Sequence, residues 1–203
     1  MLVAKKVLFI VFVVLMQAST TPKTILFFGD SLTAGYGSSP EEAFPALIEK
    51  QFNKSETKVR IVNAGISGET SAGGLGRIDW VLRQPIDIFV LELGANDGLR
   101  GLPVDATRKN LQSIIDKVKA KYPKAKIVLT GMMVPPNMGK DYADNFKNLF
   151  PELAKKNNTI LMPFLLDGVA GNPKLNIGDG IHPNPQGHKI IAGNLFPILE
   201  KLI

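Results

Sequence analysis

Apolar residues are arranged along the chain in two alternating patterns. The first is a short run rich in β-branched and aromatic residues, which predicts a buried strand. Such runs occupy residues 24–28, 59–63, 86–93, 126–132 and 159–164. Between them, apolar residues recur three and four positions apart and predict the sheet-facing side of a helix, as with Leu111, Ile114, Ile115 and Val118. Strands that alternate with helices predict an α/β fold built on a parallel sheet.

Capping residues and prolines locate several helix ends. Ser39 is followed by Glu42 in a capping-box pattern, so a helix is expected to begin there. Asn184 followed by Pro185 predicts the start of the last helix, because proline is favoured at the first helical position. Pro151 lies inside the fourth helical pattern and is expected to break or kink that helix.

The amino-terminal segment has the features of a secretory signal peptide. Lys5 and Lys6 precede ten apolar residues at 7–16, and small or polar residues follow at 17–20. A membrane-spanning helix needs about 20 apolar residues, so the alternative, an uncleaved anchor, would be too short. We therefore predict a signal peptide at residues 1–18, a single mature domain at residues 19–203, and export to the periplasm or the medium.

The amino-acid composition excludes several kinds of functional site. The 203 residues are 45% hydrophobic and 21% charged, which is typical of one globular domain. The absence of cysteine excludes disulfides, thiolate metal sites and a cysteine nucleophile, and the only histidines are His182 and His188. Without Lys5 and Lys6 the formal charge falls from +6 to +4, and the dispersed cations argue against nucleic-acid binding. Five lysines between residues 117 and 126 leave open weak contact with an anionic membrane surface.

Polar, glycine-rich segments follow three of the predicted strands, at residues 29–31, 65–68 and 94–97. A fourth, at residues 179–182, precedes the last helix. In an open parallel sheet, ligands bind beyond the carboxyl ends of the strands. These four segments are therefore expected to meet at one edge of the sheet and to form the functional site.

Ser31 is the candidate nucleophile in the first of these segments. A lone serine after a strand more often caps a helix, but a serine beside a general base is activated for nucleophilic attack. His182 is the expected base, because Asp179 stands three residues before it and can orient the imidazole. His188 has no carboxylate nearby in sequence and is expected to be a solvated or hydrogen-bonded surface histidine.

An acyl-transfer site also needs hydrogen-bond donors for the oxyanion that forms during reaction. Gly68 could offer a backbone N–H, Asn96 its side-chain amide, and Ser31 its own N–H. No G-x-S-x-G elbow, Walker A or H-E-x-x-H motif occurs, which argues against an α/β-hydrolase, a P-loop protein and a zinc protease. We expect no metal and no cofactor.

The segment Gly29-Asp30-Ser31-Leu32 resembles the nucleophile block of the GDSL family, also called SGNH hydrolases. The segments at 63–70 and 92–101 look closest to the bacterial periplasmic thioesterase/lysophospholipase branch, which is arylesterase-like. The resemblance implies a flavodoxin-like three-layer α/β/α sandwich whose five-stranded parallel sheet has the order 2-1-3-4-5. It also implies an esterase acting on acyl esters, thioesters or lysophospholipids, as a monomer or small homo-oligomer.

By the same resemblance, Ser31 is the nucleophile, His182 the base and Asp179 its partner. Ser31, Gly68 and Asn96 form the oxyanion hole. The resemblance further implies that a segment beginning at Gly98 and Leu99 covers the bound acyl chain. Val134 and Pro135 are expected to line the substrate groove.

Two other functions remain open at this point. The same triad could remove acetyl groups from an O-acetylated carbohydrate. A non-catalytic module of the receiver or flavodoxin type would use Asp30, Asp97 and Thr130 at the strand ends instead. That second alternative leaves the pairing of Asp179 with His182 without a purpose.

Overall fold

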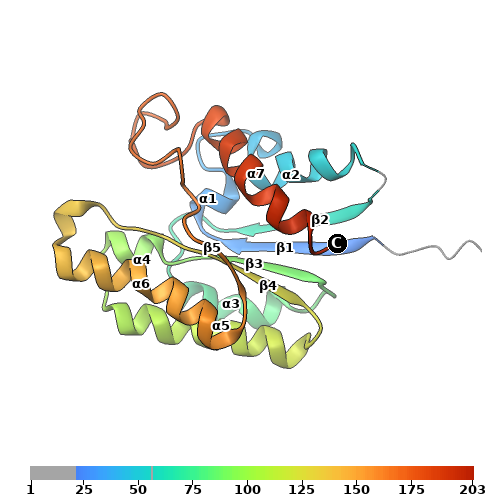
Figure 1. Ribbon diagram of the computed structural model, residues 1–203, viewed down its shortest axis with the longest axis horizontal. Coiled ribbons are helices and arrows are strands. Elements are labelled where there is room, and N and C mark those ends of the chain that lie inside the picture. The colour runs from blue at the N-terminus through green and yellow to red at the C-terminus, as the bar shows by residue number, and fades with distance from the viewer. Residues whose placement is uncertain (1–21, 56) are drawn as a thin grey trace, which may run out of the picture.

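Five parallel strands form the centre of the molecule, and helices cover both faces of the sheet (Figure 1). The computed structural model describes residues 22–55 and 57–203. The strand order β2-β1-β3-β4-β5 confirms the predicted topology. The strands are β1 (Lys23–Gly29), β2 (Val59–Gly65), β3 (Ile88–Glu92), β4 (Lys126–Thr130) and β5 (Ile160–Met162).

Helices α2 and α7 cover one face of the sheet, and α3, α5 and α6 cover the other (Figure 1). The helices are α1 (Ser31–Ala34), α2 (Phe44–Phe52), α3 (Ser71–Val81), α4 (Ala95–Leu99), α5 (Val104–Lys121), α6 (Lys140–Asn157) and α7 (Pro185–Glu200). Short 3-10 turns occupy Pro40–Glu42 and Pro136–Met138. These layers form the predicted α/β/α sandwich.

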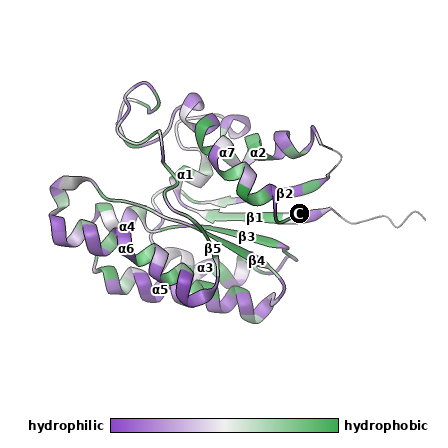
Figure 2. Cartoon of the chain, viewed as in Figure 1, coloured by the Kyte–Doolittle hydropathy of each residue, from purple (hydrophilic) through white to green (hydrophobic). Residues whose placement is uncertain are grey.

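The central strands owe their continuous apolar sequences to burial on both faces. Six of the seven residues of β1 and all five of β3 are buried, as expected for strands inside a parallel sheet covered by helices. Figure 2 shows apolar residues concentrated on the strands and polar residues on the outer sides of α5 and α6. The hydrophobic core thus lies between the layers and leaves the strand ends for the site.

Two local predictions hold only in part. Ser39 and Glu42 form the predicted capping box, with the Ser39 N–H 3.2 Å from Glu42 Oε2, but they cap a 3-10 helix, and α2 begins later at Phe44. Pro151 does not break α6, which continues from Lys140 to Asn157. Buried residues on both sides of this proline hold the helix against the sheet, so packing outweighs the lost hydrogen bond; they are Phe146, Leu149, Phe150 and Leu153.

The predicted start of the last helix is confirmed. Asn184 caps α7 by accepting hydrogen bonds from the N–H groups of Gln186 and Gly187, and Pro185 is the first helical residue. The predicted signal peptide at 1–18 lies outside the described residues. Among the helices that are described, none is both long and apolar enough to span a membrane.

Candidate active site

The structure brings Ser31, His182 and Asp179 together in one hydrogen-bonded chain. Ser31 is the first residue of α1, directly beyond the carboxyl end of β1, and is 8% exposed. Nε2 of His182 lies 2.9 Å from Oγ of Ser31, and Nδ1 of His182 lies 2.6 Å from Oδ2 of Asp179. The long segment between β5 and α7 runs back beside α1 to make this contact (Figure 1).

The turn before His182 is ordered by the Asp179 side chain. Oδ1 of Asp179 accepts hydrogen bonds from the N–H groups of Ile181 and His182, at 2.9 and 3.0 Å. Gly180 adopts a φ of 71°, a left-handed conformation that glycine tolerates without steric cost. Burial raises the pKa of the Asp179 carboxyl, but hydrogen bonds from His182 and Ile181 outweigh it and lower this pKa to about 2. Asp179 therefore stays ionised beside the imidazole.

Tyr36 is a neighbour of the imidazole that sequence reasoning missed. The N–H of Tyr36 donates to the carbonyl of Ser31 at 3.0 Å, which turns the chain back after α1. The Tyr36 and His182 ring centroids lie 4.7 Å apart. This contact limits rotation of the imidazole, although the tyrosine itself is 53% exposed. No local pattern around Tyr36 signals the contact.

Two backbone N–H groups remain available at the site. Those of Ser31 and Gly68 donate no hydrogen bond to any residue that the structure describes. Gly68 has a φ of 79°, and its carbonyl accepts from Nη2 of Arg100 at 2.9 Å. The left-handed turn and the arginine together set the direction of the Gly68 peptide.

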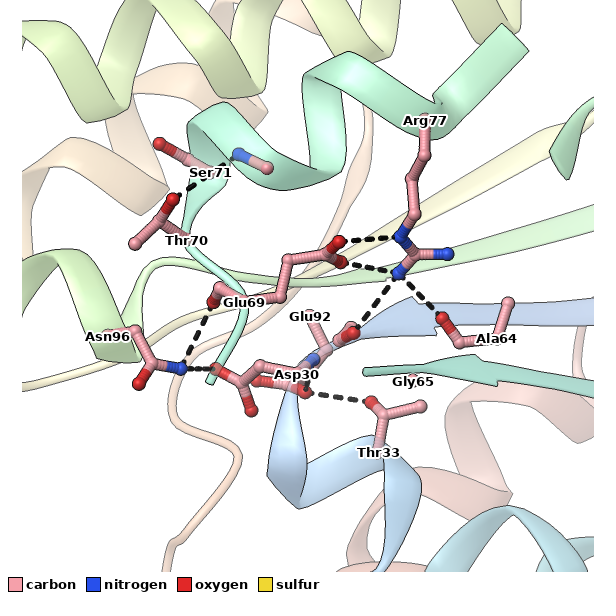
Figure 3. Close-up of polar contacts among 12 residues, drawn as sticks. Asp30, Thr33, Ala64, Gly65, Glu69, Thr70, Ser71, Arg77, Glu92 and Asn96 are labelled. Carbon is pink, nitrogen blue, oxygen red and sulfur yellow. Dashed lines mark hydrogen bonds and ion pairs between the residues drawn. The ribbon is translucent and has the colours of Figure 1, made fainter. Parts of the chain in front are cut away.

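The Asn96 side chain is held by two acceptors (Figure 3). Its Nδ2 donates to Oδ2 of Asp30 at 3.2 Å and to the carbonyl of Glu69 at 3.0 Å. Both amide hydrogens are therefore engaged within the protein, and an oxyanion would have to share one of them. Asp30 is the residue just before Ser31, so this network joins the loops that follow β1, β2 and β3.

An ion pair between Arg77 on α3 and Glu69 stabilises the loop that follows β2. The guanidinium of Arg77 binds both carboxylate oxygens of Glu69 and donates to the Ala64 carbonyl at 2.8 Å (Figure 3). It also lies over the Phe28 ring. The side chains of Arg77 and Glu69 are only 18% and 7% exposed. The pair thus fixes the segment that carries both Gly68 and the carbonyl acceptor of Asn96.

Glu92, at the end of β3, is a second residue that sequence reasoning missed. It is completely buried and lies beside Asp30, whose N–H donates to Glu92 Oε2 at 3.1 Å. Burial raises the pKa of Asp30 to about 6, and burial together with the Asp30 charge raises the pKa of Glu92 well above its ordinary value. The available signal was a carboxylate flanked by apolar residues at 88–91 and 93.

The four residues expected to contact substrate occupy two neighbouring segments. Gly98 and Leu99 end α4, where Gly98 is buried and Leu99 is 41% exposed. Val134 is half-buried and Pro135 exposed in the segment after β4. A methyl group on Gly98 would overlap Cγ1 of Val134, so the two segments pack directly together. Their contact with substrate stays a prediction.

The expectation for His188 was wrong. This residue is fully buried in α7, next to the ring of Phe44, with neither ring nitrogen hydrogen-bonded to a described residue. Burial lowers its pKa to about 4. Its helix face turns toward α2, which the sequence around His188 does not reveal. Of the two histidines, His182 is the one that lies within hydrogen-bonding distance of Ser31.

Comparison with known proteins places the chain in a family. A model of the GDSL-like lipase/acylhydrolase family matches residues 27–190. The chain belongs to this family. It is 38% identical over 184 residues to an arylesterase of Vibrio mimicus, covering 90% of this chain and 91% of that protein.

Two further matches agree with this assignment. The hydrolase is 38% identical over 196 residues to thioesterase 1/protease 1/lysophospholipase L1 of Escherichia coli K12, covering 96% of this chain and 92% of that one. A crystal structure of TesA matches it with a TM-score of 0.85 at 37% identity, over 89% of this chain and 100% of that chain. This GDSL-family protein is thus a carboxylic ester hydrolase. Among its described residues, no group of three or more histidines, aspartates and glutamates is placed to hold a metal ion.

Proposed function

We propose that this protein is a serine esterase that works through an acyl-enzyme on Ser31. The observation that carries the proposal is the continuous chain from Ser31 Oγ to His182 Nε2 and from His182 Nδ1 to Asp179, with distances of 2.9 and 2.6 Å. A serine hydroxyl is a weak nucleophile until a base accepts its proton. In this arrangement the imidazole accepts it, and the ionised Asp179 stabilises the resulting imidazolium.

The reaction then proceeds in two halves. Ser31 Oγ attacks the acyl carbonyl, and the oxyanion receives hydrogen bonds from the N–H groups of Ser31 and Gly68 and from the Asn96 amide. The imidazolium of His182 returns its proton to the departing alcohol or thiol as the carbon–oxygen or carbon–sulfur bond breaks. Water, deprotonated by His182, then attacks the acyl carbon, and the bond to Ser31 Oγ breaks as the imidazolium returns its proton to Oγ, which releases the acid and regenerates the enzyme.

The proposed substrates are acyl esters and thioesters, including lysophospholipids. Names of relatives support this choice, since they include an arylesterase and a thioesterase/lysophospholipase. Large apolar side chains are also exposed in the loops around the serine, namely Tyr36, Ile66, Leu99, Met133 and Ile181. We assign acyl-chain binding to the segments of Gly98 and Leu99 and of Val134 and Pro135.

The test is hydrolysis of p-nitrophenyl esters from acetyl to long acyl chains, by wild type and by Ser31→Ala. Activity that depends on Ser31 and rises toward medium or long chains supports the proposal. Ser31-dependent activity confined to acetyl would instead indicate a carbohydrate acetylesterase. Equal turnover by the Ser31→Ala variant would refute the serine mechanism.

We also propose that the protein is exported, on the basis of Lys5, Lys6 and the apolar run at 7–16. Expression of the full chain in a bacterium and fractionation of the cells would test this. Activity in the periplasm or medium, with an amino terminus near residue 19, is the expected result. Full-length protein retained in the cytoplasm would contradict it.

A further inference from the structure

Glu92 occupies a position that the fold has made room for. In the β1–β3 pairing it lies opposite Gly29. A side chain at Gly29 would overlap both Oε2 of Glu92 and Oγ1 of Thr33. The missing side chain therefore allows a buried carboxyl group to sit directly beneath the turn that carries Ser31.

The hydrogen bonds of Glu92 leave its carboxyl group poorly compensated. Oε2 accepts from the N–H of Asp30 at 3.1 Å and from the hydroxyl of Thr33 at 2.7 Å, whereas Oε1 has no partner among the described residues (Figure 3). Two neutral donors do not neutralise a buried carboxylate, and an unpaired buried charge is very costly. The nearby guanidinium of Arg77 is already bound to Glu69.

The carboxyl groups of Glu92 and Asp30 are close neighbours, and the charge of Asp30, together with burial, raises the pKa of Glu92. Two adjacent carboxylates cannot both ionise readily, so one of the two carboxyl groups is expected to hold a proton. Asp30 has the better support for a negative charge, since its Oδ1 accepts from the Leu32 N–H at 3.0 Å and its Oδ2 from Asn96. The proton therefore belongs on Glu92.

We propose that Glu92 is a protonated positioning residue, whose neutral carboxyl group accepts from the Asp30 N–H and the Thr33 hydroxyl and thereby fixes the start of α1 at Ser31 and, through Asp30, the Asn96 amide. The structural part of this inference, a buried neutral Glu92, stands alone. Its effect on the oxyanion donors rests on the proposed serine mechanism. Glu92 makes no hydrogen bond to Ser31, His182 or Asn96 in the described part of the chain, and it acts only through Asp30 and Thr33.

The charged groups around Glu92 determine how the network that holds Asn96 responds to high pH. Asp30 is the acidic group in direct contact, and it also feels the charge of His182. On α3, Arg77 is neutralised by Glu69. On α4, the Asp97 carboxylate is bound by Ser71 and Thr107. Loss of the Glu92 proton at high pH would place two carboxylates side by side with no free cation described beside them, so the network that holds Asn96 should loosen.

The direct test is infrared spectroscopy of the full-length protein at pH 7, comparing wild type with Glu92→Gln. Wild type should show a carbonyl stretch of a protonated, buried carboxylic acid that Glu92→Gln lacks. The matched control is Glu200→Gln, which removes an exposed carboxylate at the end of α7 and should change only ionised-carboxylate bands. Loss of only ionised-carboxylate bands in Glu92→Gln would overturn the inference, whatever the enzymatic activity.

Kinetics test the positioning role. Glutamine is uncharged and can still accept from the Thr33 hydroxyl and the Asp30 N–H, so Glu92→Gln should keep kcat within about threefold of wild type at pH 7. It should also lose the fall in kcat that we expect of wild type at high pH. Glu92→Leu removes the acceptor and should lower kcat by about 10²-fold with KM nearly unchanged, because a displaced catalytic group costs rate.

The outcomes separate the two proposals. If Glu92→Gln loses activity as severely as Glu92→Leu, or keeps the wild-type decline at high pH, the positioning role is wrong. If Glu92→Leu does not fold, the infrared spectra and the Glu92→Gln profile still decide. If Ser31→Ala remains active while the protonated-acid band is present, the serine mechanism fails but the buried neutral Glu92 survives.

Discussion

Nε2 of His182 lies 2.9 Å from Oγ of Ser31, although 151 positions separate the two residues in sequence. The contact depends on two loops from opposite ends of the chain, one after β1 and one before α7. The imidazole is held from the other side by Asp179 and along its face by Tyr36. Contacts within the protein therefore orient the imidazole, as the proposed general-base role requires.

Removal of the imidazole should abolish most of the activity. His182→Ala should lower kcat by about 10⁶-fold, as removal of a catalytic-triad base does in serine proteases, and Asp179→Ala should cost somewhat less, about 10⁴-fold. Steady-state kinetics with a p-nitrophenyl ester would measure both, with circular dichroism as the check on folding. Activity of folded His182→Ala near the wild-type value would show that another group is the base.

Asn96→Ala should lower kcat by about 10² to 10³-fold while KM changes little, because an oxyanion donor acts mainly in the transition state. The measurement is kcat and KM on the same ester. Thr70→Ala serves as a control, since its side chain accepts only from the Gly73 N–H at the start of α3. A loss in Asn96→Ala no larger than in Thr70→Ala would remove Asn96 from the oxyanion hole.

His188 should make the fold sensitive to acid. The pKa of His188 is lowered to about 4 by burial, from 6.5, so the folded protein resists its protonation while the unfolded chain accepts a proton. Stability from the neutral imidazole is complete above pH 6.5 and is lost as the pH falls toward 4, by about 3 kcal/mol in total. Glu42 and His182 act on the same ring in opposite directions.

Urea unfolding of wild type and His188→Leu at several pH values tests this. The free energy of unfolding of the variant, relative to wild type, should rise as the pH is lowered from 7 to 4. Asp30 and Glu92 titrate in both proteins, so the difference isolates His188. If the difference in the free energy of unfolding between His188→Leu and wild type stays constant with pH, the prediction is wrong. The kcat of the variant at pH 7 should remain near the wild-type value.

The pair formed by Arg77 and Glu69 should contribute strongly to stability. Arg77→Met leaves the Glu69 carboxylate, 7% exposed, without its cation, which should cost about 3 to 5 kcal/mol. In a domain of this size that corresponds to a fall in Tm of roughly 10 °C. The double variant Glu69→Gln/Arg77→Met should recover part of the loss.

The control for this prediction is an exposed ion pair. Lys117→Met breaks the bond to Asp79, whose side chain is 73% exposed, and should change stability by about 1 kcal/mol or less. Calorimetry of the variants gives the comparison. Equal shifts in Tm for Arg77→Met and Lys117→Met would mean that breaking the buried Arg77–Glu69 pair costs no more stability than breaking an exposed one.

Gly98→Ala should destabilise the protein by about 1 to 3 kcal/mol through overpacking. The new methyl group would overlap Cγ1 of Val134 and lie 2.9 Å from Cζ of Phe146. Gly193→Ala in α7 is the matched control, because a methyl group there meets nothing within 4 Å and should stabilise the helix by about 0.5 to 1 kcal/mol. Thermal unfolding measures both changes in stability. If Gly98→Ala is as stable as wild type, Val134 and Phe146 can move aside to accommodate the methyl group.

The elements and the location of the site could be predicted from sequence for local reasons. Apolar runs and helical spacing follow from which side chains face the core, and both β1 and β3 are buried as their sequences indicate. Residues that directly follow strands, such as Ser31 and Asn96, necessarily lie at the carboxyl edge of a parallel sheet. The pairing of Asp179 with His182 is equally local, since three positions separate them.

Contacts between elements that are distant in sequence could not be predicted and became known from the fold. Whether His188 faces solvent or Phe44 depends on how α7 packs on α2. Glu92 beside Asp30, and Tyr36 against His182, arise where separate loops converge. The strands, the helices and the loops that carry the site residues follow from local sequence patterns, because periodicity and strand ends are local properties. Burial, pKa and hydrogen-bond partners were decided by packing, because they depend on side chains that the local sequence does not contain.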